Sequence, residues 1–266
     1  MKRALVLASI AVAAAAAAQA PDPTAAEFDK FRVVLEQDNP AELFEVKGEE
    51  LWRARRGPKN ASLERCDLGL GPGVVKGAYA QTPRYFADVD RVMDAEARIV
   101  HCMVTLQGFK FEELAKQPFS NEVRTPDPVS LVTYVAAQSR GMKLAAPQDH
   151  PKERATYETG KSIYFYRAGA FDFACASCHG VDDKRIRTQP LPNFTKPEQA
   201  IRAVQGWPGY RMTGGVMHSL QWRVNDCFRQ QRFPEPGYGS ETVSALLTYL
   251  TVNANGQVYR GPGIKR

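Results

Sequence analysis

Three residues that could carry out redox chemistry lie within five positions of one another: Cys175, Cys178 and His179 form the pattern C-x-x-C-H. This pattern is the attachment signature of a c-type haem. Two thiols at this spacing can add to the two vinyl groups of one porphyrin, and the adjacent imidazole can bind the iron as its proximal ligand. A thioredoxin-type dithiol or a zinc site could use the same cysteines, but no βαβ pattern surrounds them and no second ligand pair follows at zinc spacing. We therefore predict one covalently attached haem c.

The sixth position of the haem iron has four downstream candidates: Met212, Met217, His218 and Cys227. Methionine is common on the iron of electron-transfer cytochromes, but methionines are also common core residues. The stretch 222–232 predicts a helix that ends before Pro234, and Arg223 then lies one turn before Cys227 on the same face. A fixed cation there would lower the pKa of the thiol and attract an anion. The residues alone leave both a reactive thiolate and a buried inert thiol open.

The odd number of cysteines, five, excludes a simple disulfide scaffold. The elements that must position them are helical, because apolar residues recur at spacings of three and four and strand-like alternation is scarce. Four such stretches end near a glycine, and Pro, Gly and polar clusters separate them. These predicted helices lie at 96–108, 127–141, 155–169 and 240–256. We predict a mainly α-helical protein with long connecting loops.

The two halves of the chain share a sequence pattern. Thr133-Tyr134-Val135 before Gly141 matches Thr248-Tyr249-Leu250 before Gly256, and residues 48–66 resemble residues 160–175 in the order of a Gly, an aromatic residue, an Arg and a Cys. The same order in both halves favours a duplication. We predict two cytochrome c-like domains, at 21–150 and 151–266, with a boundary in the Pro- and charge-rich stretch 145–154.

The first predicted domain has no haem ligands. If Cys66 corresponds to Cys175, then Gly69 and Leu70 stand where Cys178 and His179 stand in the second domain. Cys66 and Cys102 can then pair with each other, and a disulfide would stabilise a domain that lacks a cofactor in its core. We expect that disulfide, and two separate buried thiols are the alternative.

The N-terminal end of the sequence indicates export. Lys2 and Arg3 precede an apolar, Ala-rich stretch and small residues at Ala18 and Ala20, so residues 1–20 read as a secretory signal peptide. We expect a mature periplasmic protein with no membrane span, in a compartment where cysteine pairs persist. The formal net charge of +6 is too mild to indicate a nucleic-acid partner.

Taken together, the motifs resemble those of the SoxA family, the cytochrome subunits of the SoxAX complex of bacterial thiosulfate oxidation, in its monohaem form. The similarity covers nearly the whole mature chain. The matching segments are 65–69, 77–80, 83–86, 102–103, 175–179, 207–211, 225–227 with Arg232, and 248–250.

The resemblance implies that Cys227 is both the distal thiolate ligand of the haem and the active-site cysteine, able to carry sulfur as a persulfide. It implies that Arg223 binds substrate, that Cys175 and Cys178 hold the haem, and that His179 is its proximal ligand. Dihaem members carry a second C-x-x-C-H where this chain has residues 66–70. That departure implies a single haem here and supports the Cys66–Cys102 disulfide.

The activity implied is that of an L-cysteine S-thiosulfotransferase, an enzyme that oxidatively couples thiosulfate to a cysteine of the carrier protein SoxYZ and passes electrons to cytochrome c. The implied partner is the cytochrome SoxX, in a heterodimer. Arg229 and Arg232 could add to the positive field, although each also fits a solvated charge. The alternatives are a thiosulfate dehydrogenase that forms tetrathionate, a purely electron-transferring cytochrome with Met212 or Met217 on the iron, and a structural subunit.

Overall fold

The computed structural model describes residues 30, 34, 38–115, 125–186 and 189–265, so the predicted signal peptide lies outside the described residues. Asn39–Arg266 forms one compact unit, and it contains most of both predicted domains. No helix among the described residues has both the length and the apolar character needed to cross a membrane. The proposed boundary stretch 145–154 extends into the first turn of the helix Pro151–Phe165, and the boundary stays a prediction.

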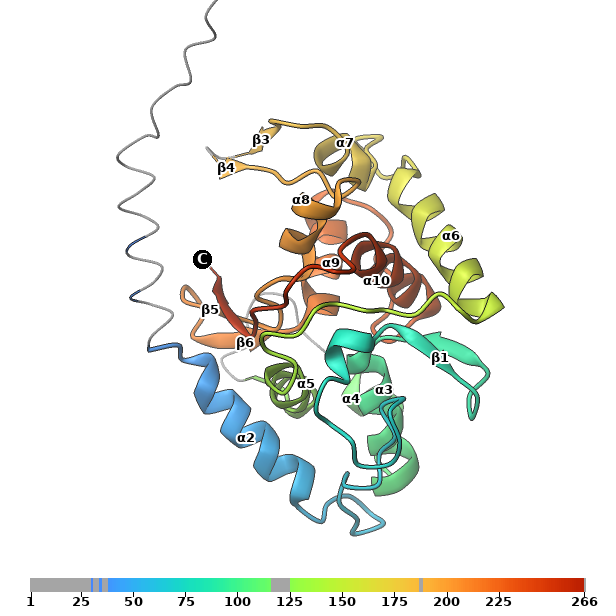
Figure 1. Cartoon of the computed structure of the whole chain (residues 1–266), viewed down its shortest axis with the longest axis vertical. Helices are drawn as coiled ribbons and strands as arrows, with labels where there is room; N and C mark the ends of the chain where they lie inside the picture. Colours follow the sequence, from blue (N-terminus) through green and yellow to red (C-terminus); the bar gives the residue numbers. More distant parts are fainter. Residues whose placement is uncertain (1–29, 31–33, 35–37, 116–124, 187–188, 266) are drawn as a thin grey trace, which may run out of the picture. The chain divides into compact units, whose positions relative to one another are not determined.

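The unit is mainly α-helical, as predicted, with three small sheets of two or three short strands among its described residues (Figure 1). Its helices are α2 (Ala41–Arg53), η1 (Tyr79–Gln81), α3 (Ala95–Cys102), the π-helical η2 (Met103–Gln107), α4 (Phe111–Leu114), α5 (Asp127–Ala137), α6 (Pro151–Phe165), α7 (Cys175–His179), α8 (Pro197–Val204), α9 (Leu220–Gln230) and α10 (Glu241–Asn253). Its strands are β1 (Arg84–Phe86), β2 (Arg91–Met93), β3 (Arg185–Ile186), β4 (Gln189–Pro190), β5 (Gly209–Arg211), β6 (Val216–His218) and β7 (Gly263–Lys265).

Two helix pairs cross in the same way, α2 against α5 and α6 against α10 (Figure 1). Each crossing is possible only because a glycine lies in it. A Cβ atom on Gly48 would overlap the backbone oxygen of Ser130, and one on Gly160 would overlap that of Ala245. The next nearest residue is Tyr134 in the first pair and Tyr249 in the second, the two tyrosines that the sequence pattern matched.

We expect Gly160→Ala to lower the free energy of unfolding by at least about 2 kcal/mol, because the added methyl group pushes α6 away from α10. Chemical denaturation of the haem-loaded chain measures the change. Gly237→Ala is the matched control, since no atom lies within 4 Å of a Cβ at that position. Equal midpoints for the two variants would contradict this account of the crossing.

Each half also contains a β-hairpin that leads directly into a helix. β1 and β2 pair antiparallel with Phe86 opposite Arg91, and β5 and β6 pair antiparallel with Arg211 opposite Val216. A cis X-Pro bond, at Pro83 or Pro208, precedes each hairpin. Strands of three residues are too short to show alternation, so the sequence did not predict them.

The helices that follow the hairpins, α3 and α9, begin at a shared polar joint formed by Asp94, Glu96, Ser219, Gln221 and Ser244. Asp94 and Ser219 are the N-caps of α3 and α9. The Asp94 carboxylate accepts hydrogen bonds from Gln221 Nε2 (2.8 and 3.0 Å) and Ser244 Oγ (2.8 Å), and Ser219 hydrogen-bonds Glu96. The two contacts are therefore reciprocal. The N-cap of α3, Asp94, binds the residue two positions after the N-cap of α9, and Ser219 does the same toward α3.

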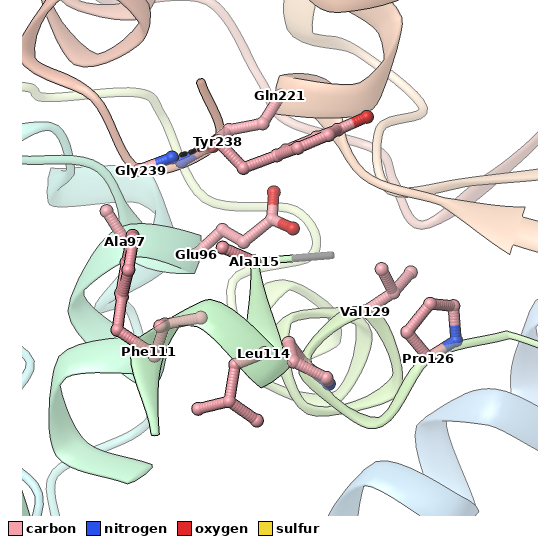
Figure 2. Close-up of a pocket in the computed structure, with 12 residues that line it drawn as sticks. Glu96, Ala97, Phe111, Leu114, Ala115, Pro126, Val129, Gln221, Tyr238 and Gly239 are labelled. Carbon is pink, nitrogen blue, oxygen red and sulfur yellow. Dashed lines mark hydrogen bonds between the residues drawn. The ribbon is translucent and has the colours of Figure 1, made fainter. Parts of the chain in front are cut away.

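Glu96 is the buried acid of this joint. Its carboxylate lies in a pocket lined by Phe111, Leu114, Val129 and Tyr238, and one of its oxygens is buried without a hydrogen-bond partner among the described residues (Figure 2). Burial raises the pKa of Glu96 to about 8, and the neighbouring Asp94 adds to the shift while the Ser219 hydrogen bond opposes it. Glu96 is therefore protonated at neutral pH.

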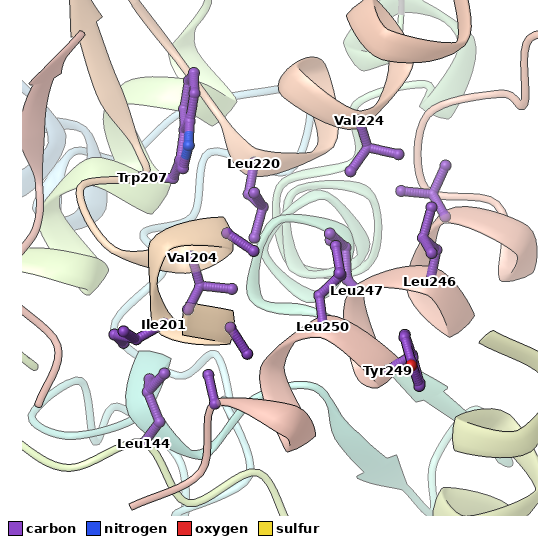
Figure 3. Close-up of a cluster of buried hydrophobic side chains, with 14 of the residues drawn as sticks. Leu144, Ile201, Val204, Trp207, Leu220, Val224, Leu246, Leu247, Tyr249 and Leu250 are labelled. Atoms are coloured by element: carbon purple, nitrogen blue, oxygen red, sulfur yellow. The ribbon is translucent and has the colours of Figure 1, made fainter. Parts of the chain in front are cut away.

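Two large apolar clusters form the core. One lies mainly in the second half, where Leu220 and Val224 of α9 pack with Leu246, Leu247 and Tyr249 of α10 (Figure 3). The other lies in the first half and includes Trp52, Leu63, Ile99, Leu131 and both Cys66 and Cys102. Each half thus buries its own pair of long helices.

Candidate functional site

The C-x-x-C-H motif forms the short helix α7. The Ser177 side chain, inside the motif, accepts a hydrogen bond from the Ala174 backbone N–H (2.9 Å) and so closes the first turn. His179 Nδ1 lies 3.0 Å from the carbonyl oxygen of Pro192. A carbonyl can only accept, so Nδ1 carries the hydrogen and Nε2 keeps the lone pair that an iron ligand needs. The His179 ring also stacks on Phe194, with centroids 4.2 Å apart.

Cys227 lies near the C-terminal end of α9, which forms where the sequence predicted a helix. The Ser219 side chain caps this helix by accepting from the Trp222 N–H, and Arg223 follows one turn before Cys227. The end of α9 is held close to the segment before the motif: Gly169 has φ +73° and approaches the Arg232 carbonyl too closely for any side chain.

These two helices bring the predicted site residues together. Cys227 interacts electrostatically with Cys175 and Cys178, and Arg223 interacts with both Cys227 and His179. All three cysteines are partly buried thiols outside the disulfide. The donor set fits a c-type haem: two thiols can form thioethers, His179 Nε2 can bind the iron, and Cys227 can supply a second axial ligand.

The electrostatics of Cys227 correct one expectation. Arg223 lowers the pKa of the Cys227 thiol, as predicted, but burial has the larger effect and Asp226 adds to it, so the pKa of this thiol is raised in the protein without its haem. Burial also lowers the pKa of His179, which keeps its imidazole neutral and able to bind a metal. The charge of Arg223 is therefore not enough to ionise the free thiol. Its main chemical use is to attract an anion.

The other candidates for the iron lie elsewhere. Met217 is fully buried against Ala41 and Val129, and Met212 is half exposed on the hairpin loop. His218 stacks on Trp222 with centroids 3.7 Å apart, and burial lowers its pKa to about 4. These environments fit the structural roles that the family resemblance left to the three residues.

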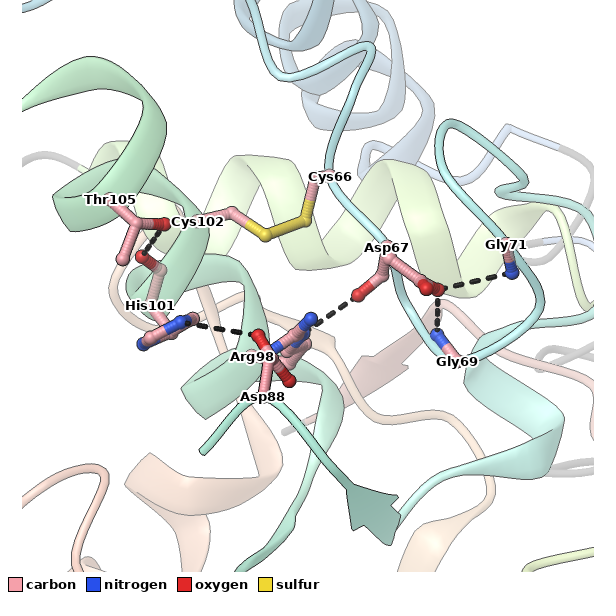
Figure 4. A network of polar contacts seen from close by, with 9 residues as sticks. All are labelled: Cys66, Asp67, Gly69, Gly71, Asp88, Arg98, His101, Cys102 and Thr105. Atoms are coloured by element: carbon pink, nitrogen blue, oxygen red, sulfur yellow. Dashed lines mark hydrogen bonds and ion pairs between the residues drawn. A yellow bond between two sulfur atoms is a disulfide. The ribbon is translucent and has the colours of Figure 1, made fainter. Parts of the chain in front are cut away.

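The first half contains the expected disulfide, Cys66–Cys102, with both residues almost fully buried (Figure 4). Gly69 and Leu70 follow Cys66, and the Asp67 side chain accepts hydrogen bonds from the Gly69 and Gly71 N–H groups. Arg98 bridges this loop to Asp88, donating to the Asp67 carbonyl (2.7 Å) and to the Asp88 carboxylate (2.7 Å). A cross-link and an ion pair thus occupy the region that corresponds to the haem motif.

We expect the double variant Cys66→Ala, Cys102→Ala to lose about 2 to 5 kcal/mol of unfolding free energy, because the disulfide closes a loop with a sequence separation of 36 residues. Denaturant titration of the haem-loaded protein, with the haem absorbance recorded in parallel, measures this loss. An unchanged midpoint would show that the disulfide contributes nothing to stability.

Two charged residues on or against the helix α9 were not among the predicted site residues. Asp226 is buried and accepts hydrogen bonds from Arg223 (3.0 Å), Arg229 (2.6 Å) and Gln230 (2.7 Å), so it holds two arginines at the site. Arg211 lies on β5 with its guanidinium carbon 5.5 Å from the Trp222 ring centroid. Both lie in segments, 207–211 and 225–227, that match the SoxA motifs in the sequence.

The chain is similar to several known proteins. A family model described as the SoxA/TsdA cytochrome c domain matches residues 47–144. The SoxA subunit of L-cysteine S-thiosulfotransferase from Hydrogenophilus thermoluteolus is 48% identical over 90% of this chain and 87% of its own length. The chain belongs to the SoxA family. A SoxA from Hydrogenobacter thermophilus is 32% identical over 84% of this chain and 83% of its own length.

A solved structure shows the same fold within the family. The crystal structure of SoxXA from P. pantotrophus has a TM-score of 0.71 and 26% sequence identity, and the match covers 89% of this chain and 84% of that chain. The SoxA family model matches the half of the chain that carries the disulfide, although the C-x-x-C-H motif lies in the other half. The cytochrome c character of the first half therefore does not depend on a haem motif.

Proposed function

We propose that this chain is the cysteine-bearing subunit of an L-cysteine S-thiosulfotransferase, which couples thiosulfate to a cysteine of the SoxYZ carrier. In this reaction a sulfur–sulfur bond forms between the carrier cysteine and thiosulfate, two electrons pass to cytochrome c, and the thiol proton goes to solvent. The observation that carries the proposal is the convergence of Cys227, Arg223 and the haem motif at one place. The relatives named for this activity support it.

The roles of the site residues follow from their chemistry. Cys175 and Cys178 would hold one haem c through thioether bonds, and His179 and Cys227 would be ligands of its iron. When bound, the haem supplies a metal that holds the thiolate of Cys227 and accepts single electrons. Arg223 binds the thiosulfate dianion. Loss of two electrons to cytochrome c joins the outer sulfur of thiosulfate to the Cys227 thiolate, and the carrier thiolate then attacks that sulfur, so that the new sulfur–sulfur bond forms on the carrier and Cys227 leaves as a thiolate.

The chain then consists of two cytochrome c-like halves from a duplication, of which only the second holds haem. The matched glycine crossings of the helix pairs, the two hairpin-to-helix units and the reciprocal polar joint support this organisation. Gly69 and Leu70, in place of a second Cys and His, support a single haem.

The setting we propose is the periplasm, in complex with SoxX. The sequence of residues 1–20 supports export, and the likeness to SoxXA supports the partner. A second redox centre on a partner suits the reaction, since it releases two electrons and one iron accepts only one at a time.

A carrier-dependent assay tests the proposal. The haem-loaded complex with SoxX is given thiosulfate and ferricytochrome c, with and without SoxYZ, and intact-mass spectrometry follows the carrier. We expect thiosulfate to be added to the carrier cysteine and cytochrome c to be reduced only when the carrier is present. Robust tetrathionate formation without carrier would favour the thiosulfate dehydrogenase instead.

A further inference from the structure

The two hairpin-to-helix units correspond residue by residue. Each position in residues 208–227 lies 125 residues after its counterpart in residues 83–102, as Pro208 does after Pro83 and Cys227 after Cys102. The strands, the N-caps and the helices keep this spacing. Arg98 and Arg223 occupy the same position, one turn before the cysteine. The environments of these two arginines can therefore be compared directly.

In the first unit the arginine is neutralised. Arg98 donates to both carboxylate oxygens of Asp88 (2.7 and 3.0 Å), and its guanidinium carbon lies over the Phe86 ring, 4.2 Å from the centroid. Its side chain is only 6% exposed. Asp88, which neutralises the charge, and Phe86, which packs against the guanidinium, both come from the hairpin that precedes the helix.

In the second unit both of those groups are replaced. The counterpart of Asp88 is Thr213, which carries no charge, and the counterpart of Phe86 is Arg211, a second cation. The Arg223 side chain is 36% exposed. Burial lowers the pKa of Arg211, the Asp226 carboxylate raises it and the charge of Arg223 lowers it, so Arg211 faces both of these α9 residues.

Asp226 is the acid that faces both arginines. Arg223 shares its carboxylate partner, Asp226, with Arg229. Within the described part of the chain, Arg211 forms no ion pair and contacts the ring of Trp222. His218 adds no charge at neutral pH, because its pKa is about 4. Arg211 and Arg223 therefore place two guanidinium groups around the Asp226 carboxylate, next to the helix that carries Cys227.

We propose that Arg211 is a second anion-binding residue, which acts with Arg223 to select a doubly charged sulfur oxyanion beside Cys227. This inference rests on the proposed function and deepens it, since it assigns the selectivity for thiosulfate to a pair of arginines. The Trp222 ring positions the Arg211 guanidinium, and Asp226 positions that of Arg223. Two guanidinium groups then share the charge of one bound dianion.

The test uses the haem-loaded complex with SoxX and measures binding of sulfate, an unreactive dianion, and of nitrate, a monoanion, by calorimetry. Arg211→Phe copies the first unit, where Phe86 packs under Arg98, and is therefore expected to fold. We expect it to weaken sulfate binding by about ten- to a hundredfold, to weaken nitrate binding less, and to raise the KM for thiosulfate more than it lowers kcat. Arg211→Lys should recover part of the sulfate affinity.

The controls separate this inference from the proposed function. Arg202→Gln removes one exposed positive charge from α8 and should leave sulfate binding unchanged. If Arg211→Phe binds sulfate as the unaltered complex does while Arg223→Gln does not, Arg211 has no such role. Unchanged binding in both variants would overturn the arginine pair. The two proposals can also fail separately. If Arg211→Phe loses sulfate affinity but the unaltered complex does not modify the carrier, the anion site is supported and the transferase activity is contradicted.

Discussion

Replacing Cys227 with serine should reduce carrier-dependent thiosulfate coupling by at least about a thousandfold while leaving the haem attached. The sulfur that the proposed reaction oxidises is then missing, and a hydroxyl cannot form a disulfide-type intermediate. The thioether positions, Cys175 and Cys178, and the contact between His179 and Pro192 are untouched. The measurements are the rate of cytochrome c reduction with carrier present and the mass of the purified subunit.

The spectrum of the same variant tests the ligand assignment. Sulfur ligation by Cys227 should be lost from the optical and electron paramagnetic resonance spectra. Met212→Leu is the matched control, because Met212 was a candidate ligand and is half exposed; this variant should keep both the turnover and the spectrum. A Cys227→Ser protein with normal turnover and a methionine-type spectrum would falsify the catalytic role.

Replacing Glu96 with glutamine should remove a pH dependence of stability. The folded-state pKa of Glu96 is raised from 4.5 to about 8, so the folded protein keeps a proton that the unfolded chain loses near pH 4.5. Stability therefore falls as the pH rises from about 4.5 to 8, by a few kcal/mol at roughly 1.4 kcal/mol per pKa unit, and changes little from this group above pH 8. Glutamine stays neutral throughout this range.

The expected result is that Glu96→Gln is more stable than the unaltered protein by a few kcal/mol at pH 8.5 and about equally stable at pH 4.5. The substitution also copies the other half of the polar joint, where Gln221 holds the corresponding position. Denaturant unfolding of the haem-loaded chain at several pH values gives the profile. Glu158→Gln, on the exposed face of α6, should leave that profile unchanged. Parallel profiles for the Glu96 variant and the unaltered protein would rule out this explanation.

The sequence predicted those features that depend on local spacing. The helix around Cys227 was predicted because Arg223 and Cys227 are one turn apart and Pro234 follows, and α9 ends at Gln230. The helix matches between the halves were visible because Tyr134 and Tyr249 sit in long periodic segments. The disulfide was predicted from the loss of haem ligands after Cys66 and is present in the structure.

The features that the sequence did not reveal depend on contacts between distant residues. Asp94 and Gln221 are 127 positions apart, and nothing in either local sequence shows that they hydrogen-bond. Arg211 sits on a strand of three residues, which presents no periodicity. The net effect on the Cys227 thiol was also missed, because the strength of burial depends on packing that a helical pattern does not define.

The polar joint has a consequence for how the two halves of the chain depend on each other. In the joint, Asp94 at the start of α3 binds Gln221 of α9, and Ser219 at the start of α9 binds Glu96 of α3. These reciprocal contacts resemble those of an isologous interface between two copies of one subunit. A fragment beginning near residue 150 would lose the Asp94 carboxylate that Gln221 and Ser244 bind, and with it a fixed start for the helix that carries Cys227. Asp94 of the first half thus helps to fix the start of α9, the helix of the second half that carries Cys227.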